Sequence, residues 1–234
     1  MSLPVLLLPG MMCDARLFGP QIAALEPDRP VAVPMLTGAD TVEGLAARIL
    51  SEAPERFALG GLSMGGIVAM EILSQAADRV AGIALMDTNP LAEMDAVKAR
   101  RAPQITKAQA GRMAEVMRDE MKPNYLTDGP NRQDILDLCM DMAIGLGAEV
   151  FVDQSLALRD RPDQSETLRG YKGPALVLCG IDDALCPVSR HKLMHDLMPQ
   201  STLTIINGAG HLPTLEQPDE TTNALRNWLD SIPG

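Results

Sequence analysis

Short apolar runs alternate with segments of helical spacing through the first 90 residues. Four runs are too short for helices and end at Gly, Pro or polar residues, which predicts buried strands: 3–8, 31–33, 57–61 and 83–86. Three segments between them place apolar residues on one helical face: 17–26, 41–53 and 66–75. This alternation predicts βαβ units and a parallel sheet that is covered by helices on both faces.

The pattern changes between residues 91 and 170. Charged residues, Met and Ala recur there at helical spacing, no run predicts a strand, and we expect two to four helices. The alternation then resumes, with strands predicted at 175–179 and 202–206 and helices at 189–198 and 218–229. The predicted fold class is α/β: residues 1–90 and 171–234 form a mostly parallel, doubly wound core, and residues 91–170 form a helical insertion.

One motif in the core predicts a nucleophile. Gly61-Leu62-Ser63-Met64-Gly65 matches G-x-S-x-G, follows an apolar strand and precedes a helix. A tight turn with small neighbours projects a serine from the end of such a strand. The alternative is a glycine-rich turn that only packs or binds phosphate.

A serine hydroxyl needs a base within hydrogen-bond reach to become a nucleophile. His211 lies in a glycine-rich loop after a predicted strand, where its imidazole can reach across the sheet edge. The other two histidines, His191 and His195, lie four residues apart on a predicted helix. The Glu of an H-E-x-x-H metal site is absent between them, so we expect a solvated helix face.

The base in turn needs a carboxylate that fixes its tautomer. Asp182 and Asp183 both follow the strand that ends at Cys179, and Asp87 follows the strand before it. All three remain candidates on position alone. The developing oxyanion needs two backbone N–H groups. We expect one from Met64, after the nucleophile, and one from Met11 in the loop after the first strand, with Met12 as the alternative.

The composition of the chain excludes some classes of binding partner. The net charge of -11 argues against nucleic acid or an anionic membrane, and no apolar run is long enough to span a bilayer. The four cysteines form no metal-binding spacing and are expected to be free thiols. We see no basic leader, so a cytoplasmic location is expected. Without a dinucleotide fingerprint, P-loop or ligand cluster, we expect no cofactor and no metal.

These motifs together resemble the α/β-hydrolase superfamily. The chain order Ser63, Asp183, His211 is that of the superfamily, and Leu-Leu-Pro-Gly, Gly-Leu-Ser-Met-Gly-Gly and Gly-Ala-Gly-His-Leu-Pro resemble its oxyanion turn, nucleophile elbow and histidine loop. Relatives commonly place the acid in Gly-x-x-Asp-x-x-x-Pro. Gly180, Asp183 and Pro187 fit that pattern, so the resemblance favours Asp183. Pro9-Gly10 stands where many relatives have His-Gly, and the 91–170 insertion stands where relatives carry a helical cap.

The resemblance implies a serine hydrolase of the esterase or lactonase kind that acts through an acyl-enzyme, with a small-molecule ester or lactone as its partner. The Met-rich insertion favours a small or medium apolar substrate. We expect the short basic run Lys98, Arg100 and Arg101 to be a solvated helix face. Two alternatives stay open because the fold supports several functions: a triad-dependent lyase or C–C hydrolase of the menaquinone-pathway kind, and a ligand-binding sensor with slow turnover. Oligomeric state has no signal in the sequence.

Overall fold

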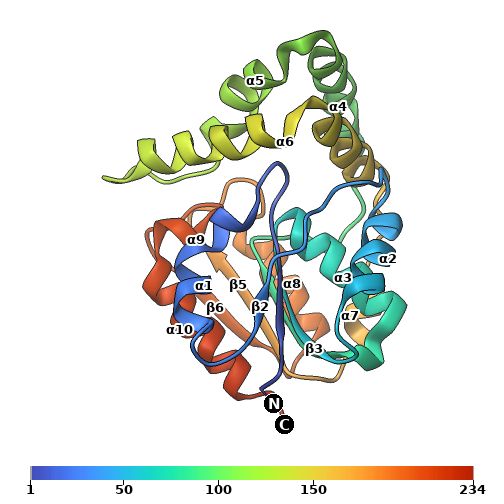
Figure 1. Ribbon diagram of the computed structural model, residues 1–234, viewed down its shortest axis with the longest axis vertical. Helices are drawn as coiled ribbons and strands as arrows, with labels where there is room; N and C mark the ends of the chain where they lie inside the picture. The colour runs from blue at the N-terminus through green and yellow to red at the C-terminus, as the bar shows by residue number, and fades with distance from the viewer. Residues whose placement is uncertain (1, 234) are drawn as a thin grey trace.

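A computed structural model describes residues 2–233 and contains a six-stranded parallel sheet (Figure 1). Its strands are β1 (Val5–Leu8), β2 (Val31–Ala32), β3 (Phe57–Leu62), β4 (Val80–Met86), β5 (Ala175–Gly180) and β6 (Thr202–Ile206). They are ordered β2-β1-β3-β4-β5-β6 across the sheet, and each neighbouring pair is parallel. The predicted α/β class with a doubly wound, parallel sheet is confirmed.

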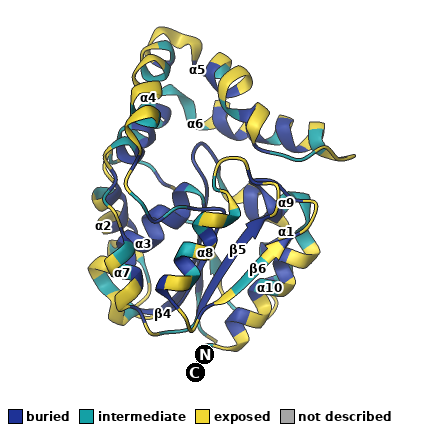
Figure 2. Ribbon diagram, turned by 180° about the vertical axis from the view of Figure 1, so that it is seen from behind, coloured by how far each residue is buried: buried dark blue, intermediate teal, exposed yellow. Residues whose placement is uncertain are grey.

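Helices cover both faces of this sheet because its central strands are apolar on both sides. Every residue of β1, β3, β4 and β5 is buried. One face carries α1 (Gly19–Leu25) and α10 (Pro218–Asp230), which contact each other. The other face carries α2 (Val42–Glu52), α3 (Met64–Ala76) and α8 (Val188–Leu197). The buried, dark blue sides of these helices face the strands in Figure 2.

Local signals account for where the helices begin and end. The Thr41 hydroxyl accepts a hydrogen bond from the Gly44 amide at 3.1 Å and caps the start of α2. The chain leaves the helix at Ala53, just before Pro54. Helix α3 begins two residues earlier than the apolar spacing predicted, because Ser63 leads directly into it.

The segment between β4 and β5 is helical. It contains α4 (Asp95–Lys107), α5 (Met113–Glu115), α6 (Arg132–Asp160) and α7 (Ser165–Gly170), with π-helical segments at Ala108–Arg112 and Val116–Met121. Positive φ angles at Gly111 and Gly147 interrupt the helical path. In Figure 1, α4, α5 and α6 stand beyond the carboxyl ends of the strands, whereas α7 packs against α3 and α8. The expected insertion, residues 91–170, therefore includes at its end one helix, α7, that packs on the core rather than above it.

No helix within residues 2–233 has both the length and the apolar character needed to cross a bilayer.

The carboxyl ends of the parallel strands share one edge of the sheet, under α4 to α6. This edge is where open α/β sheets place their ligand sites.

Candidate active site

The turn between β3 and α3 holds Ser63 in a strained conformation. Its φ and ψ are 54° and -115°, a region of backbone conformation that residues other than glycine rarely occupy. The surrounding structure fixes this geometry: the Ser63 amide donates to the Met86 carbonyl at 2.9 Å, and the Thr88 hydroxyl donates to the Ser63 carbonyl at 2.7 Å. Ser63 lines a cavity at this turn.

Two glycines in the motif permit this turn through close backbone contacts. A Cβ on Gly61 would lie 2.3 Å from the Gly65 carbonyl oxygen, and one on Gly65 would lie 1.9 Å from the Leu8 carbonyl oxygen. Both distances are too short for any side chain, so strand, turn and helix pack together only because these positions are glycine.

Three side chains from different strand ends form a hydrogen-bonded row. His211 Nε2 lies 2.9 Å from Ser63 Oγ, and His211 Nδ1 lies 2.9 Å from Asp183 Oδ2. Asp183 and His211 are each 4% exposed. With the proton on Nδ1, the imidazole donates to Asp183 and leaves Nε2 free to accept the proton of Ser63.

The Asp183 carboxylate is held by hydrogen bonds on both oxygens. Oδ1 accepts from the amides of Leu185 and Cys186 at 2.8 and 3.0 Å, while Oδ2 accepts from His211. Burial raises the pKa of this carboxyl, but the charge and hydrogen bond of His211 and the two amides outweigh it and leave the pKa below its usual value. Asp183 is therefore an anion beside the imidazole.

The other two carboxylates differ from Asp183 in position. Asp182 is exposed on the turn, so the two neighbours diverge as expected. Asp87 is fully buried, and its Oδ1 accepts a hydrogen bond from the Gly180 amide at 2.9 Å. Burial and the charge of Asp183 raise the pKa of Asp87 well above its usual value, which favours the neutral form of that carboxyl. Neither makes a hydrogen bond to His211 within residues 2–233.

The two amides expected to hold an oxyanion have no hydrogen-bond acceptor among residues 2–233. These are the N–H groups of Met11, in the turn after β1, and Met64, the first residue of α3. The alternative, Met12, differs because its amide donates to Gln154 Oε1 at 2.8 Å. Gln154 Nε2 also donates to the Leu36 carbonyl, so this α6 side chain ties the turn to the neighbouring loop.

The histidine loop has two supports that the sequence did not reveal. Glu216 Oε2 accepts from the amides of Gly210 and Leu212 at 3.0 and 3.1 Å, one on each side of His211. The His211 amide donates to the Tyr125 carbonyl at 2.7 Å. Glu216 follows His211 in the same motif, so its spacing is a usable signal; Tyr125 lies in the helical segment and offers none.

A cavity of about 440 Å³ opens over the row, a size suited to a small ligand. Ser63 and His211 lie on its floor, with Cys13 and Cys186 beside them. Burial raises the pKa of both thiols, with the charge of Asp183 adding to the effect on Cys186, so neither is a thiolate. Ser63 Oγ, by contrast, makes a hydrogen bond to the His211 imidazole.

The cavity walls include both apolar and basic side chains from the helical segment. Met94, Val97, Met121 and Leu158 supply apolar surface, and Arg100, Arg101, Arg161 and Arg190 also line the cavity. The expectation that the basic run is a solvated helix face is wrong for Arg101, which is partly buried against Glu93. Arg100 is exposed, yet it borders the cavity. Sequence spacing could not show which face of α4 meets the core.

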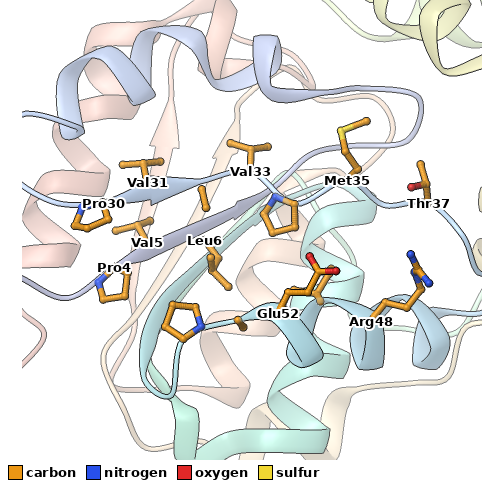
Figure 3. A pocket seen from close by; sticks show the side chains of 15 residues that line it. Pro4, Val5, Leu6, Pro30, Val31, Val33, Met35, Thr37, Arg48 and Glu52 are labelled. Atoms are coloured by element: carbon orange, nitrogen blue, oxygen red, sulfur yellow. The ribbon is translucent and has the colours of Figure 1, made fainter.

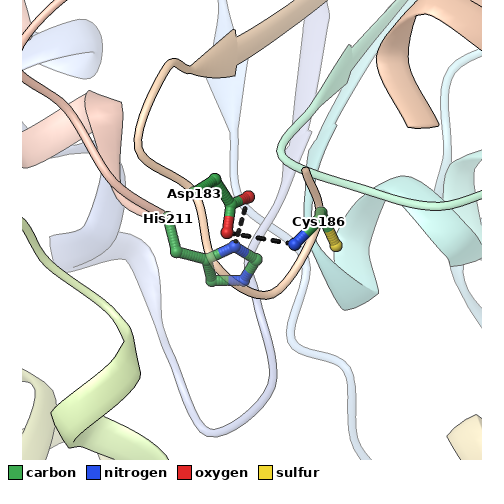
Figure 4. A group of neighbouring side chains, drawn as sticks. All are labelled: Asp183, Cys186 and His211. Atoms are coloured by element: carbon green, nitrogen blue, oxygen red, sulfur yellow. Dashed lines mark hydrogen bonds and ion pairs between the residues drawn. The ribbon is translucent and has the colours of Figure 1, made fainter. Parts of the chain in front are cut away.

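Asp183, Cys186 and His211 place their possible metal-ligand atoms within 4.8 Å of one another (Figure 4). Figure 4 shows the Asp183 carboxylate between the imidazole ring and the Cys186 backbone nitrogen. Both carboxylate oxygens and both ring nitrogens already make hydrogen bonds, and the thiol is protonated. We therefore assign the Asp183 and His211 side chains to the hydrogen-bonded row with Ser63, to which Cys186 contributes only its backbone amide.

A second hollow of about 580 Å³ lies at the β2 edge of the sheet (Figure 3). Its lining comes from β1, β2 and α2, with Arg48 and Glu52 as the charged side chains among the described residues. It contains none of the candidate site residues, so we place the candidate active site in the smaller cavity over Ser63.

The structure also resembles solved hydrolases along its full length. A thermophilic esterase from Thermogutta terrifontis, in a malate-bound structure, superposes with a TM-score of 0.91 at 30% identity, covering 99% of this chain and 91% of that one. The model of the alpha/beta hydrolase family matches residues 5–224. The chain belongs to the alpha/beta-hydrolase family.

Curated relatives of this alpha/beta hydrolase include a bifunctional protein of biotin biosynthesis and an esterase. The bifunctional protein BioHC of Cellvibrio japonicus is 25% identical over 244 residues, which cover 99% of this chain and 49% of that protein. A pimeloyl-(acyl-carrier protein) methyl ester esterase from Photobacterium profundum is 25% identical, covering 82% of this chain and 77% of that one. The chain spans about half or less of the length of the two BioHC relatives.

The remaining histidines of this alpha/beta hydrolase correct one expectation. His191 is fully buried on α8 rather than solvated, and its Nε2 accepts a hydrogen bond from the Thr88 amide at 3.1 Å. Burial lowers the pKa of His191 to about 4. His195 is partly exposed and contacts the Ser201 hydroxyl at 2.8 Å. The i, i+4 spacing predicted that the two histidines share a helix side, but not that Thr88, in the loop after β4, would contact His191.

The buried His191 makes stability depend on pH. The unfolded chain takes up a proton on this histidine below about pH 6.5, whereas the folded chain does so only near 4. Its stabilising contribution is therefore complete above pH 6.5 and is lost as pH falls toward 4, by about 2 kcal/mol between pH 7 and 5. His191→Gln keeps an acceptor for Thr88 and does not titrate, so the variant should lose about 2 kcal/mol less over this interval.

Urea unfolding at pH 7 and pH 5 measures this difference. His195→Gln on the same helix is the matched control and should retain the wild-type dependence. Equal losses of unfolding free energy in wild type and His191→Gln would show that His191 is not the group responsible.

Proposed function

We propose that this chain is a serine hydrolase that cleaves an ester, lactone or related acyl bond of a small or medium substrate. The observation that carries the proposal is the row Ser63–His211–Asp183, with both links at 2.9 Å, at the floor of a cavity. The strained turn at Ser63 and the esterase names of the relatives from Thermogutta terrifontis and Photobacterium profundum support the same reading.

The proposed reaction begins with proton transfer within this row. Ser63 Oγ attacks the ester carbonyl as its proton passes to His211 Nε2, and Asp183 stabilises the imidazolium that forms. The charge that develops on the carbonyl oxygen is held by the amides of Met11 and Met64. The imidazolium then protonates the departing alcohol oxygen, and an acyl group remains on Ser63.

Water completes the proposed cycle. The oxygen of a water molecule attacks the acyl carbonyl while His211 Nε2 accepts a proton from that water. The carboxylic acid leaves when the imidazolium returns the proton to Ser63 Oγ. Every step uses side chains and amides of this chain, and no redox change occurs. The apolar side chains that α4 and α6 contribute to the cavity lining support an apolar acyl chain as the group bound there.

Turnover of p-nitrophenyl hexanoate tests the proposal. We expect a burst of p-nitrophenol that approaches one equivalent per chain, or steady release without a burst if deacylation is fast. His211→Gln, purified in the same way, should release product at the background rate because Ser63 loses its base. Equal release by wild type and this variant would contradict the proposal, and stoichiometric binding without release would favour a sensor.

A further inference from the structure

Four arginines line the cavity over Ser63, in a chain whose net charge is -11. We call Arg100, Arg101, Arg161 and Arg190 the arginine wall. Arg100 and Arg101 lie on α4, Arg161 follows the end of α6, and Arg190 lies on α8. Apart from the catalytic row, the acidic side chains in the lining are Glu93 and Glu120. Such a local excess of positive charge in an acidic protein favours the binding of a negatively charged ligand.

The inner part of the wall has more positive than negative charge. Arg101 Nε donates a hydrogen bond to the Glu93 carboxylate at 2.9 Å, and Arg161 Nη2 forms an ion pair with the same carboxylate at 3.0 Å. The side chains of Glu93, Arg161 and Arg101 are only 6, 7 and 12% exposed. One carboxylate cannot neutralise two guanidinium groups, and uncompensated charge is costly where water is excluded. Burial, opposed by Glu93 and reinforced by Arg101, lowers the pKa of Arg161.

The outer part of the wall is not neutralised either. Arg100 and Arg190 make no ion pair within residues 2–233, and Arg190 is half-buried. Glu120, the other acid in the lining, is already paired with Lys107 at 2.6 Å and accepts from Gln104. The cavity therefore presents guanidinium donors whose charge the described residues do not balance.

We propose that the substrate carries a carboxylate, which binds the arginine wall while its ester carbonyl lies at Ser63. This inference rests on the proposed function and specifies its substrate class: a monoester of a dicarboxylic acid, or a lactone that bears a carboxylate. Planar guanidinium groups match a carboxylate with paired N–H donors, and such charged hydrogen bonds are stronger than neutral ones. The apolar side chains lining the same cavity suit the carbon chain between the two groups.

Two esters of equal chain length test the inference. Mono-p-nitrophenyl adipate and p-nitrophenyl hexanoate have the same six-carbon acyl chain and leaving group and differ in the terminal carboxylate. For wild type we expect kcat/KM to be about tenfold or more higher for the adipate, mainly through a lower KM. In the double variant Arg100→Gln, Arg190→Gln this preference should fall by about tenfold.

The matched control is the double variant Arg112→Gln, Arg118→Gln, which removes two positive charges from exposed positions outside the cavity. It should keep the wild-type preference, whereas a loss as large as in Arg100→Gln, Arg190→Gln would reduce the effect to general electrostatics and overturn the inference. Hydrolysis of hexanoate with no preference for adipate in wild type would overturn it too, independently of whether any variant folds. Failure with both esters would instead contradict the proposed function.

Discussion

Ser63→Ala is expected to lower kcat for ester hydrolysis by about 10⁵- to 10⁶-fold, the size of loss seen when a serine hydrolase loses its nucleophile. The variant keeps the cavity and the oxyanion amides but has no oxygen to form the acyl bond. Cys13 and Cys186 cannot substitute for it, because burial keeps both thiols protonated. Steady-state release of p-nitrophenol measures the effect.

Ser189→Ala is the matched control for this substitution. Ser189 is exposed on α8 and does not line the cavity, so its loss should leave kcat at the wild-type value. If Ser63→Ala retained a substantial fraction of the wild-type kcat, another group would have to form the acyl bond or water would attack directly.

Asp183→Asn is expected to lower kcat by about 10⁴-fold, the second largest effect. An asparagine amide can donate to His211 Nδ1, which moves the ring proton to Nε2. That nitrogen then cannot accept the proton of Ser63, although the hydrogen-bonded geometry is preserved. The hydrolysis of p-nitrophenyl hexanoate, followed at saturating substrate, separates this loss in kcat from any change in KM.

Asp87→Asn tests the competing acid with the same change of atoms. Burial favours the neutral form of the Asp87 carboxyl, and an asparagine oxygen can still accept from the Gly180 amide. This variant should therefore keep most of the wild-type kcat. The reverse ranking, with Asp87→Asn nearly inactive and Asp183→Asn active, would reassign the acid.

The elements at the strand ends were predictable because their signals are local. The glycines of the serine motif carry a steric requirement, and in a parallel sheet the residues after β3, β5 and β6 must meet at one edge. Ser63 and His211 followed from that reasoning. Only the family pattern favoured Asp183 over Asp182 as the acid, because both residues follow the same strand on one turn and their positions alone do not distinguish them.

The helical segment was predictable as helix but not as a cavity wall. Spacing in 91–170 showed that apolar faces exist, yet the positive φ angles at Gly111 and Gly147 redirect the chain in ways that periodicity does not encode. The partnership of Arg101 with Glu93 and Arg161 depends on that path. For the same reason, the burial of His191 depends on how α8 packs on the sheet and on the loop that holds Thr88, which the sequence of α8 alone does not determine.

Covalent labelling with a fluorophosphonate tests the central claim most directly, because the probe reacts with a serine that a neighbouring base activates. Intact mass and peptide mapping should show one probe per wild-type chain, attached to Ser63, no labelling of Ser63→Ala, and strongly slowed labelling of His211→Gln. A probe attached to another residue, or equal labelling of wild type and Ser63→Ala, would contradict the assignment of Ser63 as the nucleophile.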